Sequence, residues 1–218
     1  MTQPLEIPAG ATVLFQGDSV TDAGRVRALP DDLGVGYPLL VGSWYSAMFP
    51  ERGVRFLNRG ASGDRVVNLL ERWQDDCLAL RPDALSILIG INETWRAFDA
   101  GEPTPAHVFE RQYRDLLERT RAALPQTRIA LMEPFTLPVS SEIEAWRVDL
   151  DPKIHAVRRL ARDFGCALVP LDGLFAQAAA RREPAFWALD GIHPTPAGHG
   201  LIARAWLRGF GVDCHSAG

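Results

Sequence analysis

Short apolar runs alternate along this chain with longer stretches in which apolar residues recur every three or four positions. The short runs are rich in aliphatic and β-branched residues, which predicts strands at residues 12–16, 54–58, 84–89, 128–132 and 167–171. The longer stretches predict helices at residues 37–48, 65–80, 106–124, 151–164 and 195–210. Pro50, Pro82 and Pro125 follow three of these helices and are expected to end them.

This alternation predicts an α/β fold. Five strands separated by helices indicate a parallel sheet, and the nearly continuous apolar run at residues 86–89 is typical of a strand covered on both faces. We therefore expect a three-layer α/β/α sandwich around a five-stranded parallel sheet, with a flavodoxin-like topology. Residues 134–149 carry neither period and are expected to form a loop over or beside the site. Ligands of such sheets bind outside the carboxyl ends of the strands.

Length and composition fit one domain with a large core. The chain has 218 residues, of which 47% are hydrophobic. We expect a single domain over residues 1–218, with short flexible tails at about 1–9 and 212–218. Neither internal repeats nor low-complexity segments interrupt it.

Charge and hydropathy exclude several kinds of partner. The 27 acidic and 23 basic residues are scattered and give a net charge of −4, which disfavours nucleic acid. No apolar stretch approaches the roughly 18 residues of a membrane span, and the first ten residues lack a cationic start followed by an apolar core. We therefore expect a cytoplasmic protein without a membrane partner, and a homo-oligomer, since many intracellular enzymes are.

The cysteines indicate neither disulfides nor a thiolate metal site. Cys77, Cys166 and Cys214 are odd in number and widely spaced, with no Cys-x-x-Cys pair. We expect buried thiols, with Cys214 near the exposed tail.

A serine near the start and an Asp-x-x-His sequence near the end together suggest hydrolytic chemistry. Ser19 follows the first predicted strand in the sequence Gly-Asp-Ser-Val, and Asp190 and His193 precede the last helix. Serine is a poor nucleophile at neutral pH and needs a base within hydrogen-bond reach and an acid that orients the base. Alone, Ser19 would be an ordinary helix cap and His193 a surface residue beside a turn.

Two further segments follow predicted strands and offer hydrogen-bond donors. Gly63, after the second strand, could point its amide at an oxyanion, and Asn92, after the third, could donate from its side chain. Taken singly, Gly60 and Gly63 are more typical of a turn before a helix, and Asn92 of a turn or a cap.

Metal and phosphate sites have little support. Asp190, His193 and His199 could in principle ligate zinc, but neither a His-Glu-x-x-His sequence nor a cysteine pair accompanies them. No glycine-rich phosphate-binding sequence follows the first strand. We expect no metal and no cofactor, and we expect His107, His155 and His199 to be solvent-exposed.

In order and spacing, the four segments resemble the SGNH (GDSL-type) hydrolase family, named after a serine, a glycine, an asparagine and a histidine. Ser19, Gly63, Asn92 and His193 occupy those positions, and the resemblance spans residues 13 to about 209. The sequences around Ser19, Asn92 and His193 look most like those of bacterial acetyl xylan esterases and related carbohydrate acetylesterases. Many members have Asp after the asparagine where this chain has Glu93, which puts that residue's supporting hydrogen bonds in question.

The resemblance implies a mechanism through an acyl-enzyme. His193 would take the proton of Ser19 as the hydroxyl attacks an ester carbonyl, and Asp190 would fix the imidazole tautomer. The Ser19 and Gly63 amides and the Asn92 side chain would hold the oxyanion.

Substrate contacts are expected from residues in or near the predicted site loops. For Trp187, core packing is an equally good account. The candidates are Asp18, Tyr37, Trp95, Arg96 and Trp187.

The sequence thus predicts a serine esterase that removes acetyl groups from sugars or short xylo-oligosaccharides. A lysophospholipase or thioesterase on the same scaffold would prefer long acyl chains, and a non-catalytic carbohydrate-binding module would bind without turnover. A nucleophile, base and acid together argue against the last of these.

Overall fold

Five parallel strands form one sheet in the computed structural model, which describes residues 6–212. The spatial order is β2-β1-β3-β4-β5, so β1 and β3 lie inside the sheet. Leu14 of β1, for example, is in register with Leu57 of β2 and Leu85 of β3. The predicted parallel sheet is confirmed, and its strands are β1 (Thr12–Gly17), β2 (Arg55–Asn58), β3 (Ala84–Leu88), β4 (Arg128–Met132) and β5 (Ala167–Val169).

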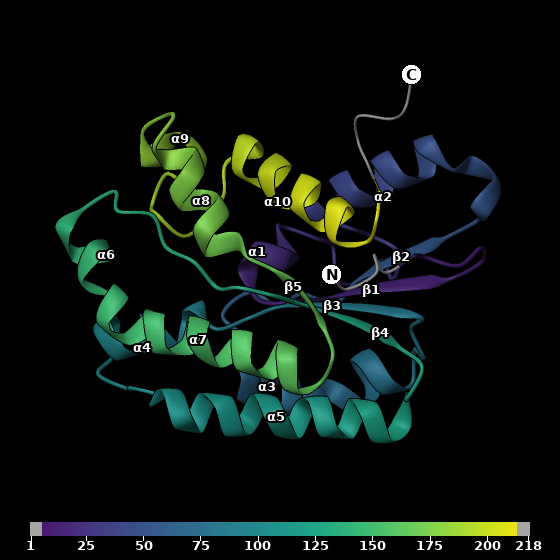
Figure 1. The fold of residues 1–218 in the computed structure, drawn as a ribbon, viewed down its shortest axis with the longest axis horizontal. Helices are drawn as coiled ribbons and strands as arrows, with labels where there is room; N and C mark the ends of the chain where they lie inside the picture. Colours follow the sequence, from purple (N-terminus) through teal and green to yellow (C-terminus); the bar gives the residue numbers. More distant parts are fainter. Residues whose placement is uncertain (1–5, 213–218) are drawn as a thin grey trace.

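Helices cover both faces of the sheet, which confirms the three layers (Figure 1). One face carries α2 (Tyr37–Met48), α8 (Leu171–Ala179) and α10 (Pro196–Gly209), and the other α3 (Val66–Trp73), α5 (Ala106–Ala123) and α7 (Arg147–Asp163). Alternate strand residues enter the two cores: Phe15 and Met132 on the first face, Leu14 and Leu131 on the second. Burial on both faces explains why the strands show no hydrophobic alternation.

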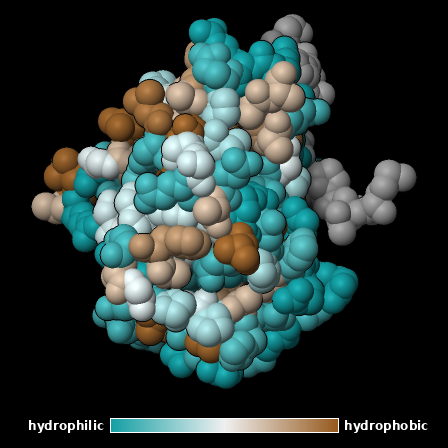
Figure 2. Space-filling model, turned by 90° about the vertical axis from the view of Figure 1, so that its left-hand side faces the viewer, coloured by the Kyte–Doolittle hydropathy of each residue, from teal (hydrophilic) through white to brown (hydrophobic). Residues whose placement is uncertain are grey.

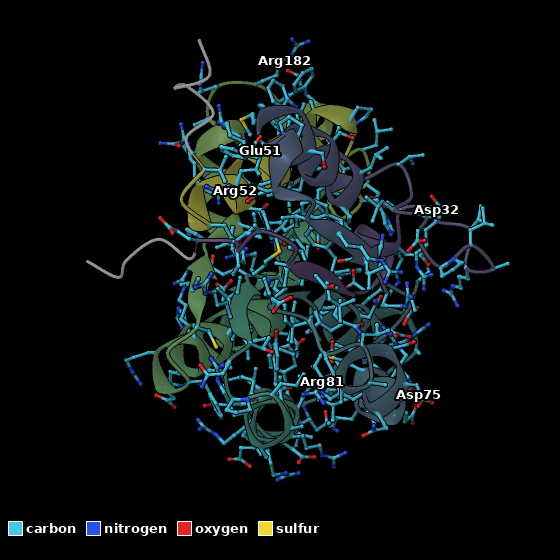
Figure 3. All side chains as sticks on the ribbon, turned by 90° about the vertical axis from the view of Figure 1, so that its right-hand side faces the viewer. Asp32, Glu51, Arg52, Asp75, Arg81 and Arg182 are labelled. Carbon is cyan, nitrogen blue, oxygen red and sulfur yellow. The ribbon has the colours of Figure 1, made fainter. Side chains whose placement is uncertain are left out.

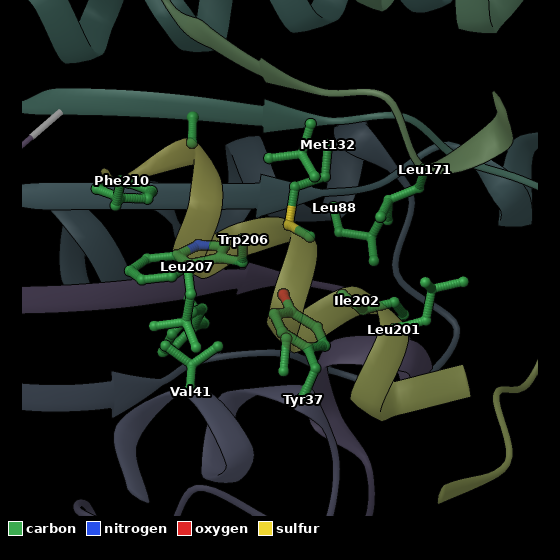
Figure 4. Packing of buried hydrophobic residues seen from close by; sticks show 14 of the residues in the cluster. Tyr37, Val41, Leu88, Met132, Leu171, Leu201, Ile202, Trp206, Leu207 and Phe210 are labelled. Atoms are coloured by element: carbon green, nitrogen blue, oxygen red, sulfur yellow. The ribbon is translucent and has the colours of Figure 1, made fainter. Parts of the chain in front are cut away.

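The packing between α2, α10 and the sheet closes the first face. Tyr37 and Val41 of α2 meet Trp206 of α10 beneath Leu88 and Met132 of the strands (Figure 4). Trp206 and Phe210 stack with ring centroids 4.0 Å apart. This cluster holds α10, and with it the loop that precedes α10, against the sheet.

Several helix boundaries differ from the prediction. Helix α7 begins at Arg147 instead of residue 151 and continues through Pro152. The proline leaves the carbonyl of Val148 without its helical donor, but Val148 is solvent-exposed, so water can replace the missing bond. Residues 134–149 are also not a continuous loop, because α6 (Ser141–Ala145) lies within them.

The short elements were not predicted. They are α1 (Ser19–Asp22), the 3-10 helix η1 (Pro50–Arg52), the π-helix η2 (Gln74–Leu78), α4 (Ile91–Asp99) and α9 (Pro184–Trp187), and α8 also belongs to this group.

The ends of the described chain are more ordered than expected. Ile7 and Val212 are buried in the first core, and the Ile7 carbonyl oxygen accepts hydrogen bonds from Tyr45 and Arg52. The predicted flexible tails are therefore wrong at these two residues, while residues 1–5 and 213–218, including Cys214, lie outside the described residues.

Arg52 and Glu51 mark the edge formed by the amino ends of the strands, opposite the carboxyl edge (Figure 3).

The two cysteines among residues 6–212 are free thiols. Cys77 is fully buried and Cys166 is half-buried. None of the helices within residues 6–212 is long and apolar enough to cross a membrane.

Candidate active site

Ser19 stands at the carboxyl end of β1 as the first residue of the one-turn helix α1. The turn is held by Asp18, whose Oδ1 accepts the N–H of Val20 at 3.0 Å. Asp18 is thus the helix cap, and Ser19, next to it, is half-buried with its side chain turned to the loop before α10.

Asp190, His193 and Ser19 form a continuous hydrogen-bond chain. Ser19 Oγ lies 2.9 Å from His193 Nε2, and His193 Nδ1 lies 2.6 Å from Asp190 Oδ2. A carboxylate only accepts hydrogen bonds, so Nδ1 carries the proton and Nε2 is left to accept from the serine hydroxyl. The arrangement brings together residues that are 174 positions apart in the sequence.

The Asp-x-x-His spacing works because Asp190 also shapes its own loop. Its Oδ1 accepts the N–H groups of Ile192 at 2.9 Å and His193 at 2.7 Å. Partial burial would raise the pKa of Asp190, but the hydrogen bonds from the His193 ring and these two amides outweigh it and hold the pKa below its usual value. Asp190 therefore stays ionised and keeps the imidazole oriented.

Gly63 lies on the segment between β2 and α3, which is bonded to α1. Ala61 N–H donates to the Gly17 carbonyl oxygen and Ser62 N–H to Asp22 Oδ2, both at 3.0 Å. Gly60 permits this close approach, because a Cβ there would come within 2.3 Å of the Asp22 nitrogen.

Two of the three expected oxyanion donors, the Ser19 and Gly63 amides, have no acceptor in the described part of the chain. Gly63 is exposed with a φ of 83°, a conformation that favours glycine. Among the described residues, no acceptor takes the backbone N–H of Ser19 or of Gly63. Asn92, in the first turn of α4, donates from Nδ2 to the Asp64 carbonyl oxygen at 3.0 Å, and its second amide hydrogen remains.

Buried charges lie beneath these loops. Burial raises the pKa of Asp18 and of Glu93 to about 7 each, although backbone N–H groups bind both carboxylates. Lys153 of α7 is fully buried, is paired with Asp149, and lies 3.4 Å from Thr94 Oγ1. The Lys153 charge lowers the pKa of Glu93 against the effect of burial.

Trp95 of α4 lies beside the chain of three residues. Its ring centroid is 5.8 Å from that of His193 and 5.6 Å from that of Trp146, on which Phe98 stacks. Trp146 lies between α6 and α7, far along the chain, and no sequence signal linked it to the site. The aromatic side chains form a wall at one side of His193.

The predictions for Tyr37 and Asp18 as substrate contacts are wrong. Tyr37 is fully buried and its hydroxyl lies 3.0 Å from Thr21 Oγ1, under α1. Asp18 is only 1% exposed, because its side chain turns inward to cap α1.

Arg96 and Trp187 are placed differently from Trp95. Arg96 pairs with Asp99 one turn further along α4, at 3.2 Å. Trp187 lines a cavity with Phe186 and Arg204 between α9 and α10, and its carbonyl oxygen accepts the N–H of Thr195. Trp187 therefore supports the loop that carries His193 through its backbone.

His199 is half-buried, contrary to the expected exposure, whereas His107 and His155 are exposed as predicted. Its Nδ1 accepts the N–H of Tyr37, the first residue of α2, at 3.2 Å. Burial lowers the pKa of His199 to about 4, and the charge of His193 adds to this. His199 thus joins α10 to α2 as a neutral acceptor.

We expect acid to destabilise the protein through His199. Between its ordinary pKa of 6.5 and the folded value of about 4, the unfolded chain takes up a proton that the folded chain does not. The free energy of unfolding should therefore decrease as the pH is lowered from about 6.5 to about 4. His199 contributes up to about 3 kcal/mol to this decrease, and its contribution stays constant below pH 4. Urea denaturation of the wild type and of His199→Asn, whose amide oxygen accepts without titrating, measures this difference. Parallel pH profiles would contradict it.

A small cavity lies next to the residues of the site. It is lined by Asp18, Val20, Ile91 and Ile192 and has a volume of about 10 Å³. That is barely room for one water molecule. On the face of the molecule that Figure 2 shows, apolar residues lie interspersed with hydrophilic ones. In the described part of the chain, no group of three or more His, Cys, Asp or Glu side chains could hold a metal ion.

Known proteins similar in sequence to this chain are esterases or acylhydrolases. Residues 15–201 match the model of the GDSL-like lipase/acylhydrolase family. An acetylxylan esterase from Geobacillus stearothermophilus is 35% identical over 218 residues, which cover 96% of this chain and 98% of the esterase.

Solved structures agree with this. A protein from Parabacteroides merdae described as a GDSL-like lipase has a TM-score of 0.93 at 34% identity, with 96% of this chain and 100% of that chain covered. The crystal structure of the Geobacillus stearothermophilus esterase has a TM-score of 0.86 at 33% identity, with 96% and 98% covered. Two further structures of that esterase are catalytic mutants, in which a serine and an aspartate, respectively, are replaced by alanine.

Proposed function

The chain belongs to the GDSL-like lipase/acylhydrolase family, and on this premise we propose that it is a serine esterase that removes acetyl groups from sugars or short xylo-oligosaccharides. The observation that carries the proposal is the hydrogen-bond chain from Ser19 Oγ through His193 to Asp190, with distances of 2.9 and 2.6 Å. It is the arrangement that activates a serine hydroxyl.

In the proposed reaction, Ser19 Oγ attacks the acetyl carbonyl while His193 Nε2 takes its proton. The Ser19 and Gly63 amides and the Asn92 side chain stabilise the oxyanion, each by about 3 kcal/mol in the transition state. His193 then returns the proton to the leaving sugar hydroxyl. Water, activated by the same imidazole, hydrolyses the acetyl-enzyme, and no cofactor takes part.

One observation supports a short acyl group. The Geobacillus stearothermophilus relative is an acetylxylan esterase. We assign Trp95 as the wall against which a sugar ring packs, because its ring stands next to His193 and is only partly buried.

A panel of esters tests the proposal. Rates are measured with p-nitrophenyl acetate, butyrate and octanoate and with peracetylated xylobiose, using the wild type beside Ser19→Ala. We expect fast acetyl release from both acetyl substrates, a fall of at least about tenfold from acetate to octanoate, and loss of both acetyl activities in the variant. Preference for octanoate would indicate a lysophospholipase or thioesterase, and sugar binding without turnover a carbohydrate-binding module.

The homo-oligomeric state and the cytoplasmic location stay predictions. Sedimentation of the purified protein and fractionation of cells that produce it would test the two separately.

A further inference from the structure

The carboxylate of Glu93 reaches from α4 into the segment that carries Gly63. Glu93 is 1% exposed, and its Oε1 accepts the N–H of Val66, the first residue of α3, at 2.7 Å. Its Oε2 is buried and has no hydrogen-bond partner in the described part of the chain. An ionisable group is expensive to bury, so this position calls for an explanation other than packing.

The segment is held from two sides. On one side Ala61 and Ser62 are bonded to β1 and α1, the elements that present Ser19. On the other side, Asn92 donates to the Asp64 carbonyl oxygen and Glu93 accepts the Val66 N–H. Two neighbouring residues of α4 therefore hold two positions of this segment. Gly63 lies between these anchors and forms no hydrogen bond within residues 6–212, so its orientation is set by the anchors.

We propose that Glu93 is a positioning residue of the esterase reaction: by holding the Val66 amide it fixes the direction of the Gly63 N–H toward the oxyanion. The inference rests on the proposed function and extends it to a residue that the substrate does not touch. Because the bound ester carries no oxyanion and the negative charge develops only as Ser19 attacks, displacement of Gly63 lowers kcat and leaves KM unchanged.

A purely structural role gives a different result. A carboxylate at the start of a helix also stabilises that helix through the exposed N–H groups of its first turn. In that case, substitution would lower the thermal midpoint while the folded enzyme kept its kcat. The KM-against-kcat comparison at a temperature well below the midpoint separates the two roles.

Three substitutions at Glu93 vary the acceptor. Glu93→Gln keeps an oxygen at the right reach, and kcat for p-nitrophenyl acetate should stay within about threefold of the wild type. Glu93→Asp is one methylene shorter, and Glu93→Ala has no acceptor; kcat should fall by about 10-fold and about 100-fold, with KM within about twofold. Equal kcat values for all folded variants would overturn the proposal.

The partner amide can be removed independently. Val66→Pro removes the N–H that Glu93 accepts and also changes the buried side chain. The helix should tolerate it, since proline is accepted at the first position of a helix and Arg65 before it is already extended. Val66→Ala is the matched control: it loses buried side chain but keeps the N–H. We expect Val66→Pro to lose kcat like Glu93→Ala, Val66→Ala to retain it, and the double variant Glu93→Ala/Val66→Pro to lose no more than either alone. Additive losses would overturn the coupling.

Hydrogen exchange distinguishes failure of this inference from failure of the proposed function. Amide exchange over residues 60–66 should quicken in Glu93→Ala and not in Glu93→Gln, without any substrate present. If the wild type hydrolyses no ester, the proposed function fails, and this exchange still decides whether Glu93 holds the segment. Unchanged exchange in Glu93→Ala would overturn the inference even in an active esterase.

Discussion

Ser19→Ala is expected to lower kcat for acetyl esters by about 10⁴- to 10⁶-fold while the protein stays folded. The hydroxyl is the atom that attacks the carbonyl in the proposed reaction, and its removal leaves His193 Nε2 with no proton to take. Ser19 Oγ forms one hydrogen bond, to a half-exposed ring, so the free energy of unfolding should change by less than about 1 kcal/mol. Burst and steady-state kinetics with p-nitrophenyl acetate measure the first effect, and urea denaturation the second.

The control for Ser19→Ala is a serine outside the hydrogen-bond chain. Ser62→Ala lies on the neighbouring segment and keeps the backbone N–H that binds Asp22, so it should retain wild-type kcat. If Ser19→Ala kept more than about a tenth of wild-type activity, Ser19 would not be the nucleophile.

Asp190→Asn should lower kcat by about 10³- to 10⁴-fold. The asparagine Oδ1 can still accept the Ile192 and His193 amides, so the loop keeps its shape. Its NH₂ group, however, donates where Asp190 Oδ2 accepted, so His193 Nδ1 loses its proton and Nε2 gains one. An Nε2 that carries a proton cannot take another from Ser19, although a small residual rate remains from the oxyanion donors.

His193→Ala is the reference for Asp190→Asn. It removes the base outright and should show a loss at least as large. A kcat for Asp190→Asn within tenfold of the wild type would contradict the assigned tautomer, and a changed circular dichroism spectrum would show that the loop itself had moved.

The sheet was predictable because its strands are buried on both faces. Runs such as Leu85 to Leu88 must be apolar nearly throughout when helices cover both sides, and that pattern is visible locally. Helix starts were less predictable. Pro152 suggests a helix that begins near it, but the solvent exposure of Val148 lets α7 begin earlier, and such exposure is a tertiary property.

The meeting of the segments that carry Ser19, Gly63 and Asn92 was predictable for a related reason. In a parallel sheet the carboxyl ends of the strands share one edge, so residues that follow different strands meet there. Asp190 and His193 follow α9 instead of a strand, and their role was predicted from their spacing and from the family resemblance. Which side chains near Ser19 turn into the protein, away from the site, was not predictable. Asp18 and Tyr37 turn into the protein because Val20 and Thr21 offer them partners, and the sequence carries no signal for those contacts.

The buried ammonium group of Lys153 has a consequence for anyone who handles this protein. Lys153 is the only lysine in the sequence, and the other basic residues are arginines. With its side chain fully inaccessible and paired with Asp149, the folded protein offers no lysine amine to succinimidyl dyes, glutaraldehyde or amine-coupled resins. Labelling or immobilisation aimed at lysines would select molecules in which α7 has separated from α4, so a lysine introduced at the strand edge near Glu51, away from Ser19, is the safer point of attachment.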